Sequence, residues 1–336
     1  MSSTSPKKED KSLDLTLRPN TFSEYIGQES IKDNLKILIE AAKKRKESVE
    51  HILFYGPAGL GKTTLAYIMA KEMNAQMRVT SGPAIEKVGD LASILTNLTP
   101  GEILFIDEAH RLNKLIEEIL YPAMENRSLD IIIGKGPSAR AIQLELPPFS
   151  IIAATTRIAL LSSPLRSRFS GGLFRLDFYK ESDVEKIIAR SAKILGVKIE
   201  PEAVLLIAQR SRFTPRTANR FLKRARDYAE VYGEGIITKS LAKKALELME
   251  IDHKGLDSLD RKVLDTIINK FSGGPVGLTT ISASVREEED AIEEISEPYL
   301  MQLGFLERTP RGRCATARAY EHLGIKAPIN GQQKLI

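Results

Sequence analysis

Residues 56–63, GPAGLGKT, fit the pattern G-x-x-x-x-G-K-[ST] without a mismatch. Glycines at these spacings let backbone N–H groups wrap around phosphate oxygens, and the N-terminus of a following helix opposes the negative charge. In this chemistry Lys62 reaches the β- and γ-phosphates, and the hydroxyl of Thr63 binds Mg²⁺. The segment therefore predicts a site for a nucleoside triphosphate and Mg²⁺.

A pair of carboxylates ends the apolar run ILFIDE at 103–108. A buried strand that ends in a carboxylate places Asp107 at the sheet edge where ligands of open α/β folds bind. We expect Asp107 to hold the water shell of Mg²⁺ and Glu108 to activate the attacking water as a general base. The structural alternative is that the pair only caps the next helix. His110 is given no role.

Arginines further along the chain point to a neighbouring subunit and to the nucleotide. The loop SPLRSRF at 163–169 carries Arg166 and Arg168, which have no evident phosphate to reach within their own subunit. An arginine supplied by an adjacent subunit stabilises charge on a transferring phosphoryl group. Arg216 lies in the first turn of a predicted helix, where a cation opposes the helix dipole, so we expect it to meet an anion such as bound nucleotide. Ordinary surface arginines are the alternative at 166 and 168.

The elements that must position these residues follow from the hydrophobic pattern. Short apolar runs at 51–55, 102–106 and 150–156 alternate with helical patterns, which indicates a parallel sheet covered on both faces. Helical spacing at 28–46 predicts a helix before the first strand. Residues 129–146 are typical of two strands around a Gly-Pro turn, which predicts a projecting β-hairpin.

Beyond residue 180 the pattern becomes helical. The 3.6-residue period at 181–251 predicts a small helical bundle. After a linker at 253–257, the order helix, Gly-Gly-Pro turn, two helices and hairpin predicts a helix-turn-helix with a β-wing. The predicted domains are a disordered tail at 1–12, a large α/β domain at 13–180, a helical lid at 181–253 and a winged-helix head at 254–336.

Composition excludes several classes of protein. The 336 residues are 42% hydrophobic and 28% charged, and no apolar run reaches the roughly 18–20 residues that a membrane span requires. The start of the chain is polar and lacks the apolar stretch of a signal peptide. A single cysteine, Cys314, excludes an internal disulfide framework and indicates a reducing cytoplasm. One cysteine and four scattered histidines also argue against a zinc site.

The net charge of +5 is a weak indication of a nucleic-acid partner, but the charges are sorted along the last segment. Arg308, Arg311 and Arg313 share one predicted hairpin, whereas 287–297 holds seven carboxylates. Arginines on a tight hairpin suit phosphates or a minor groove and give salt-dependent binding that is largely blind to sequence. We expect the acidic segment to face away from DNA. The alternative is a solvated basic turn.

Taken together, these segments resemble the RuvB family of bacterial Holliday-junction branch-migration ATPases. The resemblance covers about residues 13–325 and rests on LRPNTFSEYIGQ, GPAGLGKTTLA, LFIDEAHRL, SPLRSRF, TPRTANR and EPYLMQLGFLERTPRGR. It implies an AAA+ large domain, a helical lid and a winged-helix head in a hexameric ring that uses ATP and Mg²⁺ on double-stranded DNA at four-way junctions. It also implies a RuvA-type partner that docks on the hairpin 129–146, and a RuvC-type resolvase in the wider complex.

The resemblance also implies roles for individual residues. Thr156 takes the sensor position, Arg168 the finger that acts on a neighbour's nucleotide, and Arg216 the second sensor. Arg308 and Arg313 match DNA-contacting positions in the wing. The nucleotide-contacting positions are Leu17, Arg18, Tyr25, Ile26, Gly59, Gly61, Lys62, Thr63, Thr64, Asn126, Arg127, Ser128, Arg168, Tyr179 and Arg216.

The chain departs from the family pattern at a few positions. It has Ala58 where Pro is usual, Ala109 where Ile is usual and Phe213 where Gly is usual, and it carries an extra residue around 170–172. These changes remove no chemical group from the site. The insertion bears on the placement of Arg168.

Three functions fit a phosphate loop followed by Asp-Glu: a ring motor on DNA, a DNA-loading switch of initiator or clamp-loader type, and a DEAH-box helicase. Clamp loaders end in a helical collar, whereas this chain ends in a predicted winged helix. A DEAH-box enzyme needs a second recA-like domain, and the helical pattern after 180 does not provide one. The sequence therefore favours the motor, and a translocation assay distinguishes it from an initiator.

Overall fold

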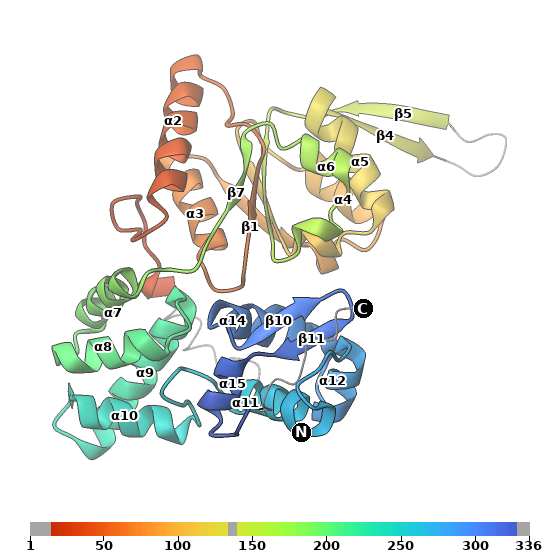
Figure 1. Cartoon of the computed structure of the whole chain (residues 1–336). Coiled ribbons are helices and arrows are strands. Elements are labelled where there is room, and N and C mark those ends of the chain that lie inside the picture. Colours follow the sequence, from red (N-terminus) through yellow and green to blue (C-terminus); the bar gives the residue numbers. More distant parts are fainter. Residues whose placement is uncertain (1–14, 134–139, 328–336) are drawn as a thin grey trace. The chain divides into compact units, whose positions relative to one another are not determined.

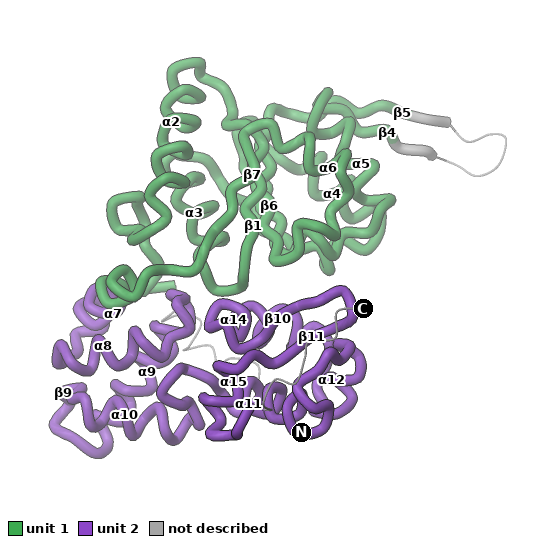
Figure 2. The backbone as a smooth tube through the Cα atoms, viewed as in Figure 1, with its two compact units in different colours: residues 1–187 green, residues 188–336 purple. Residues whose placement is uncertain are grey.

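The chain forms two compact units, residues 1–187 and 188–336, as the computed structural model shows (Figure 2). The structure describes residues 15–133 and 140–327. The predicted tail at 1–12 and the predicted Gly-Pro turn of the hairpin lie outside these ranges. The boundary between the units falls within α7 (Glu181–Leu195).

The first unit is built on a five-stranded parallel sheet with strand order β2-β3-β6-β1-β7. Strands β1, β3 and β6 are the apolar runs expected from the sequence, and almost all their residues are buried because the sheet is covered on both faces. Strands β2 and β7 were not predicted; they lie at the edges, where β7 alternates between partly buried and exposed residues and β2 is partly buried except at its middle residue. The strands are β1 (Ile52–Tyr55), β2 (Met77–Ser81), β3 (Ile103–Asp107), β6 (Ser150–Thr155) and β7 (Gly172–Arg175).

Helices cover both faces of this sheet (Figure 1). Leu53, Leu104 and Ile151 share a core with Leu91 and Leu120, so they point to the face that α4–α6 cover. The helices α2 and α3 lie on the opposite side. The helical segments are α2 (Glu29–Arg45), α3 (Lys62–Glu72), α4 (Val88–Thr96), α5 (Lys114–Asn126) and α6 (Ser163–Ser167), with single turns η1 (Gly82–Ala84), η2 (Ala109–Arg111) and η4 (Ile158–Leu160).

The predicted hairpin is confirmed and projects from the end of α5 (Figure 1). It pairs β4 (Ser128–Ile133) with β5 (Arg140–Glu145) in antiparallel register, Ser128 opposite Glu145. Leu129 is buried at its base, whereas Ile142 is 42% exposed.

The second unit contains the helical bundle, apart from the first residues of α7, followed by the winged helix, in the predicted order. The π-helical turns η5 and η6 and the helix α15 after the wing were not predicted. The lid comprises α7, β8 (Lys198–Ile199), α8 (Pro201–Arg210), α9 (Pro215–Tyr232), β9 (Ile236–Ile237) and α10 (Lys239–Leu248). The head comprises α11 (Ser258–Asp265), η5 (Thr266–Lys270), α12 (Leu278–Val285), α13 (Glu289–Ala291), η6 (Ile292–Ser296), α14 (Glu297–Gln302), β10 (Leu306–Thr309), β11 (Gly312–Ala315) and α15 (Ala317–His322). Among the described helices, none has the length and apolar character that crossing a bilayer requires.

Candidate nucleotide-binding site

The phosphate loop, residues 56–61, joins β1 to α3, and its contacts require glycine. At Gly56 φ is 134°, and a Cβ there would lie 2.3 Å from the carbonyl oxygen of Leu176. At Gly61 φ is 101°, and a Cβ would lie 2.6 Å from Oη of Tyr25. Gly61 also precedes α3, whose N-terminus has no side-chain cap. An uncapped helix start behind a glycine loop is the arrangement that receives an anion.

Lys62 places a buried ammonium group against this loop. The residue is 8% exposed, and its Nζ donates to the carbonyl oxygens of Gly56, at 2.7 Å, and Pro57, at 2.8 Å. A buried cation is stable only with oxygen partners, and charged phosphate oxygens are stronger partners than carbonyls. Thr63 and Thr64 follow in the first turn of α3. The loop, the helix start and the ammonium group thus fit nucleotide phosphates.

The two predicted carboxylates lie at the same edge of the sheet. Because β1, β3 and β6 run parallel, their carboxyl ends place the loop, Asp107 and Thr156 along one edge. Asp107 accepts a hydrogen bond from the backbone N of Glu108 at 3.0 Å. Glu108 has a φ of 48°, a left-handed conformation that persists only where the surrounding structure holds it. Its side chain is 50% exposed. The turn therefore holds Glu108 at the surface, where water can reach its carboxylate.

His110, which was given no role from the sequence, links this turn to the end of β6. Its Nδ1 lies 3.1 Å from Oγ1 of Thr155, a residue that is only 1% exposed. The contact connects the segment that carries Glu108 to the strand that precedes Thr156. Nothing in the spacing of DEAH singles out His110 for this contact, because its partner lies 45 residues away.

Two tyrosines from distant segments meet on the phosphate loop. Oη of Tyr25 donates to the carbonyl oxygen of Leu60 at 3.1 Å, and Oη of Tyr179 lies 3.0 Å from that of Tyr25. Burial raises the pKa of both phenols well above the ordinary value, so both remain neutral at physiological pH. Other predicted nucleotide contacts lie near Tyr25 in the sequence. Leu17 is buried and Ile26 is half-buried, and the guanidinium of Arg18 lies 4.4 Å from the centre of the Tyr67 ring.

Arg168 belongs to a separate group built on α5 and α6. Its guanidinium lies 4.3 Å from the ring centre of Tyr121, with Nη1 donating to Pro164 O at 2.7 Å and Nη2 3.2 Å from Oε1 of Glu125. Its Nε is buried without a hydrogen-bond partner among the described residues. Asn126, Arg127 and Ser128 follow Glu125 directly. Arg168 thus contacts the helix that leads into residues 126–128, and this helix lies across the sheet from α3 (Figure 1).

Arg216 lies in the second unit, at the start of α9. The predicted start is confirmed: the side chain of Thr214 accepts a hydrogen bond from Thr217 N at 3.3 Å, and Pro215 occupies the first turn. Arg216 is exposed. Its charge opposes the dipole of an 18-residue helix, so an anionic partner would stabilise it.

The wing differs from the expectation of three exposed arginines. Arg308 is 54% exposed and Arg311 is exposed, but the side chain of Arg313 is 11% exposed, with Nη2 2.9 Å from Oε2 of Glu297. Glu293 lies 3.2 Å from Arg308, so these two carboxylates do not face away from the wing. Arg308 and Arg313 are direct partners across the hairpin, and the repulsion between them is offset by glutamates on the face they share.

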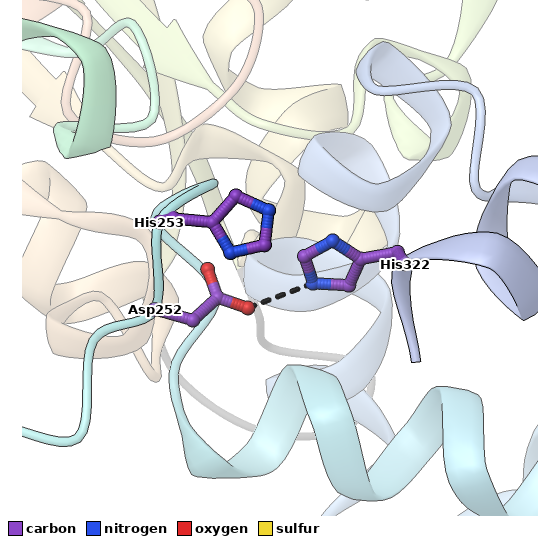
Figure 3. Close-up of side chains that lie close together, drawn as sticks. All are labelled: Asp252, His253 and His322. Atoms are coloured by element: carbon purple, nitrogen blue, oxygen red, sulfur yellow. Dashed lines mark hydrogen bonds and ion pairs between the residues drawn. The ribbon is translucent and has the colours of Figure 1, made fainter. Parts of the chain in front are cut away.

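The fold also brings together two histidines that the sequence separates. Single ligand atoms of Asp252, His253 and His322 lie within 4.8 Å of one another (Figure 3). Nε2 of His322 lies 2.8 Å from Oδ2 of Asp252, whose Oδ1 accepts from the backbone N–H groups of Lys254 and Leu256. One oxygen of Asp252 therefore closes the linker turn, and the other ties this turn to α15.

This parallel sheet, with a phosphate loop after β1 and Asp-Glu after β3, defines a P-loop ATPase of the AAA+ class. Three family models cover nearly the whole chain: the Holliday junction DNA helicase RuvB P-loop domain over 17–175, the RuvB AAA lid domain over 179–252 and the RuvB C-terminal winged helix domain over 253–324. The chain belongs to the RuvB family.

Individual relatives agree with this assignment. The chain is 59% identical over 329 residues to a Holliday junction branch migration complex subunit RuvB of Dehalococcoides mccartyi, covering 97% of this chain and 94% of that protein. A protein of the same name from Chloroflexus aggregans is 57% identical over 320 residues, covering 95% and 91%. The Thermotoga maritima RuvB Holliday junction branch migration motor superposes with a TM-score of 0.86 at 48% identity, covering 93% of this chain and 100% of that one.

Proposed function

We propose that this chain is an ATP-driven motor that draws double-stranded DNA through a Holliday junction, as one subunit of a homohexameric ring. The observation that carries the proposal is membership of the RuvB family along residues 17–324, together with Lys62, Asp107 and Glu108 at one sheet edge. The D. mccartyi relative is named as a branch migration complex subunit, and the T. maritima structure is described as a branch migration motor.

In this proposal the phosphate loop and Lys62 hold the triphosphate, and Thr63 and the water shell of Asp107 hold Mg²⁺. Mg²⁺ neutralises charge on the phosphate oxygens when it is bound. Glu108 takes the proton of the attacking water, for which its exposed carboxylate is suitably placed. Thr156, at the end of β6, senses the γ-phosphate. Tyr25 and Tyr179 flank the base together with Leu17, Arg18 and Ile26.

We assign the second half of the site to a neighbouring subunit. Arg168 follows α6 and contacts α5, and residues 126–128 join α5 to β4. The assignment is supported by the contacts of Arg168, which are made to Tyr121, Glu125 and Pro164 and not to the phosphate loop. Arg216 contacts the nucleotide from the lid. The proposed domain limits are 13–180, 181–253 and 254–336.

We assign DNA contact to Arg308 and Arg311, whose charges are exposed on the wing, and a supporting role to Arg313, which Glu297 holds inside the head. The hairpin β4–β5 is the proposed docking element for a RuvA-type partner. Its projection from the domain and the exposed Ile142 support this role.

The test is migration of a four-way junction by the full chain with a RuvA-type protein and ATP. Wild type should move the branch point, whereas Lys62→Ala and Glu108→Gln should not. Equal migration by all three proteins would exclude the motor. The second candidate is a loading switch of initiator type, since initiators also carry winged helices. Junction-dependent ATP hydrolysis without movement of the branch point would favour it.

A further inference from the structure

The lid and the head of the second unit meet through the loop 211–214, which joins α8 to α9. From this loop Arg212 enters the head: its Nη2 lies 2.9 and 2.8 Å from the two oxygens of Asp260, and its Nη1 lies 3.2 Å from Asp257. The guanidinium is also 4.8 Å from the ring centre of Tyr299 and 3.4 Å from the carbonyl oxygen of Ile295.

This contact is buried, and its components depend on one another. Asp260 is 0% exposed and the Arg212 side chain only 9%. A carboxylate in such a position is stable only with a paired cation, and here the cation comes from the lid. Asp257 and Asp260 also form the capping box of α11. One lid side chain therefore holds the first helix of the head.

The backbone of the loop is shaped for this contact. Arg212 and Phe213 have φ angles of 57° and 53°, two consecutive non-glycine residues in the left-handed region. Such a conformation persists only where surrounding contacts hold it. The ring of Phe213 lies 6.3 Å from that of Tyr299, so both strained residues are held by the head.

Further contacts fix the linker between lid and head. A Cβ at Gly255 would lie 2.3 Å from the carbonyl oxygen of Arg210, so the linker passes directly over the end of α8. Nη1 of Arg261 donates to Glu250 O at 2.7 Å. His322 ties α15 to Asp252 (Figure 3). These bonds leave the linker little freedom as a hinge.

The same loop leads directly into the proposed nucleotide sensor. Arg216 is four residues beyond Arg212, and Thr214 between them caps α9. A change in the orientation of α9 is therefore passed to α11 through a short, buried connection.

We infer that Arg212 is a positioning residue that joins the lid to the head, so that the two turn as one lever when the nucleotide state changes. This inference rests on the proposed motor function and adds how the lid moves the wing. Any hinge that links the nucleotide site to the DNA site must then lie on the N-terminal side of the lid–head body.

The rigidity is tested by distance measurement on the full chain. In a Cys314→Ala background, spin labels at Lys244→Cys in α10 and Ala283→Cys in α12 report the distance between lid and head. We expect one narrow distribution that is the same with ADP and with a non-hydrolysable ATP analogue. If the distance between the two labels differs between ADP and the ATP analogue in the chain that keeps Arg212 and Asp260, the inference is overturned. This measurement needs no junction activity, so it remains decisive if the motor function fails.

The coupling is tested by substitution at the seam. Arg212→Met with Asp260→Leu removes both charges of the buried pair; it leaves Asp257, which is 31% exposed, without its cation and removes one bond of the α11 capping box. Arg212→Lys keeps the charge without the planar fork. For the double variant we expect a broadened distance distribution, ATP hydrolysis within about twofold of wild type, and at least a tenfold loss of base pairs migrated per ATP. Arg212→Lys should be intermediate.

The matched control is Arg224→Met, an exposed arginine of α9 that pairs with Asp227, one turn further along the same helix, at 3.1 Å. It should match wild type in all three measurements. A double variant with a narrow distribution, or with a broad distribution and normal migration per ATP, would show that Arg212 does not couple lid to head. If the double variant does not fold by circular dichroism, the wild-type distances and Arg212→Lys decide.

Discussion

Glu108 occupies a left-handed turn that few side chains adopt, at the end of the strand that carries Asp107. The change Glu108→Gln keeps the shape of the side chain and removes its ability to accept a proton. We expect ATP hydrolysis to fall by at least ~10²-fold, the range for loss of a general base, with nucleotide affinity retained. Phosphate release and binding of a fluorescent ATP analogue measure the two effects separately.

The control for this prediction is Glu118→Gln, an exposed carboxylate on the nearby helix α5. It should hydrolyse ATP at the wild-type rate. Normal hydrolysis by Glu108→Gln would remove Glu108 from the role of base; the alternative of a helix cap is not seen, because Glu108 makes no side-chain cap bond and Asn113 caps α5.

His51, directly before β1, shows how a single ring supports the sheet. The backbone N of Ile151 donates to Nδ1 at 2.8 Å, so Nε2 carries the proton and donates to Met124 O at 3.2 Å. Burial lowers the pKa of His51 below 6.5. At pH values between the lowered pKa of His51 in the folded chain and 6.5, the unfolded chain binds a proton that the folded chain does not. Stability from this group is therefore present above pH 6.5 and is lost as the pH falls below it.

At the scale of strands, we expect the Ile151 amide to lose protection from hydrogen exchange as the pH falls from 7 to 5, after correction for intrinsic rates. Protonation of Nδ1 removes its acceptor. His51→Ala should cost about 1–3 kcal/mol at pH 7 and remove this pH dependence, because it leaves a buried N–H unpaired. The exposed His253→Ala is the control. Unchanged protection of Ile151 at pH 5 would contradict the neutral ring.

The wing separates two roles that its sequence does not distinguish. Arg311→Ala should weaken duplex binding and reduce the slope of log affinity against log salt by about 1, since it removes one phosphate contact. Arg313→Ala should lower the stability of the head by about 3 kcal/mol, the low end for a broken buried pair, because buried Glu297 then keeps only its longer contact with Arg308, at 3.8 Å. Binding titrations at several salt concentrations test the prediction for Arg311→Ala, and calorimetry tests the prediction for Arg313→Ala. A salt slope unchanged by Arg311→Ala would remove the wing from the DNA interface.

Whether a strand or helix could be predicted from the sequence depended on how fully it is buried and how long it is. Strands β1 and β3 are covered on both faces and read as continuous apolar runs, which the sequence shows directly. Strand β7 alternates between half-buried and exposed residues at a sheet edge, and its four residues carry too little pattern. Helix α15 is six residues long, shorter than the window over which a helical period is recognised.

For the site, the predictable part was local. Loop 56–63 and Asp107–Glu108 are contiguous, so their chemistry follows from spacing alone. The contacts of His110 with Thr155, of Arg212 with Asp260 and of Arg313 with Glu297 join residues 16 to 48 positions apart. Such pairs depend on the tertiary fold, and a single sequence gives no signal for them. The sequence therefore predicts an exposed Arg313 and gives no sign of the contact that Arg212 makes.

At the scale of the whole assembly, the separation of Arg168 from the phosphate loop of its own chain makes a prediction about mixed rings. Lys62→Ala subunits keep the arginine but lose the loop, and Arg168→Ala subunits keep the loop but lose the arginine. If every site is shared between two subunits, each variant alone should hydrolyse ATP ~10³-fold more slowly than wild type. In a mixture of equal amounts, roughly one quarter of the interfaces combine an intact loop with an intact arginine.

Mixing should therefore restore up to about a quarter of the wild-type phosphate release, if each interface acts independently. The comparison mixture replaces the Arg168→Ala subunits with chains that carry both substitutions, and it should stay inactive because no interface regains a loop. Recovery in the first mixture alone requires that Arg168 act across a subunit boundary. Full turnover by Arg168→Ala alone would place the whole site within one chain, and the group on α5 and α6 would then serve only to hold that helix pair together.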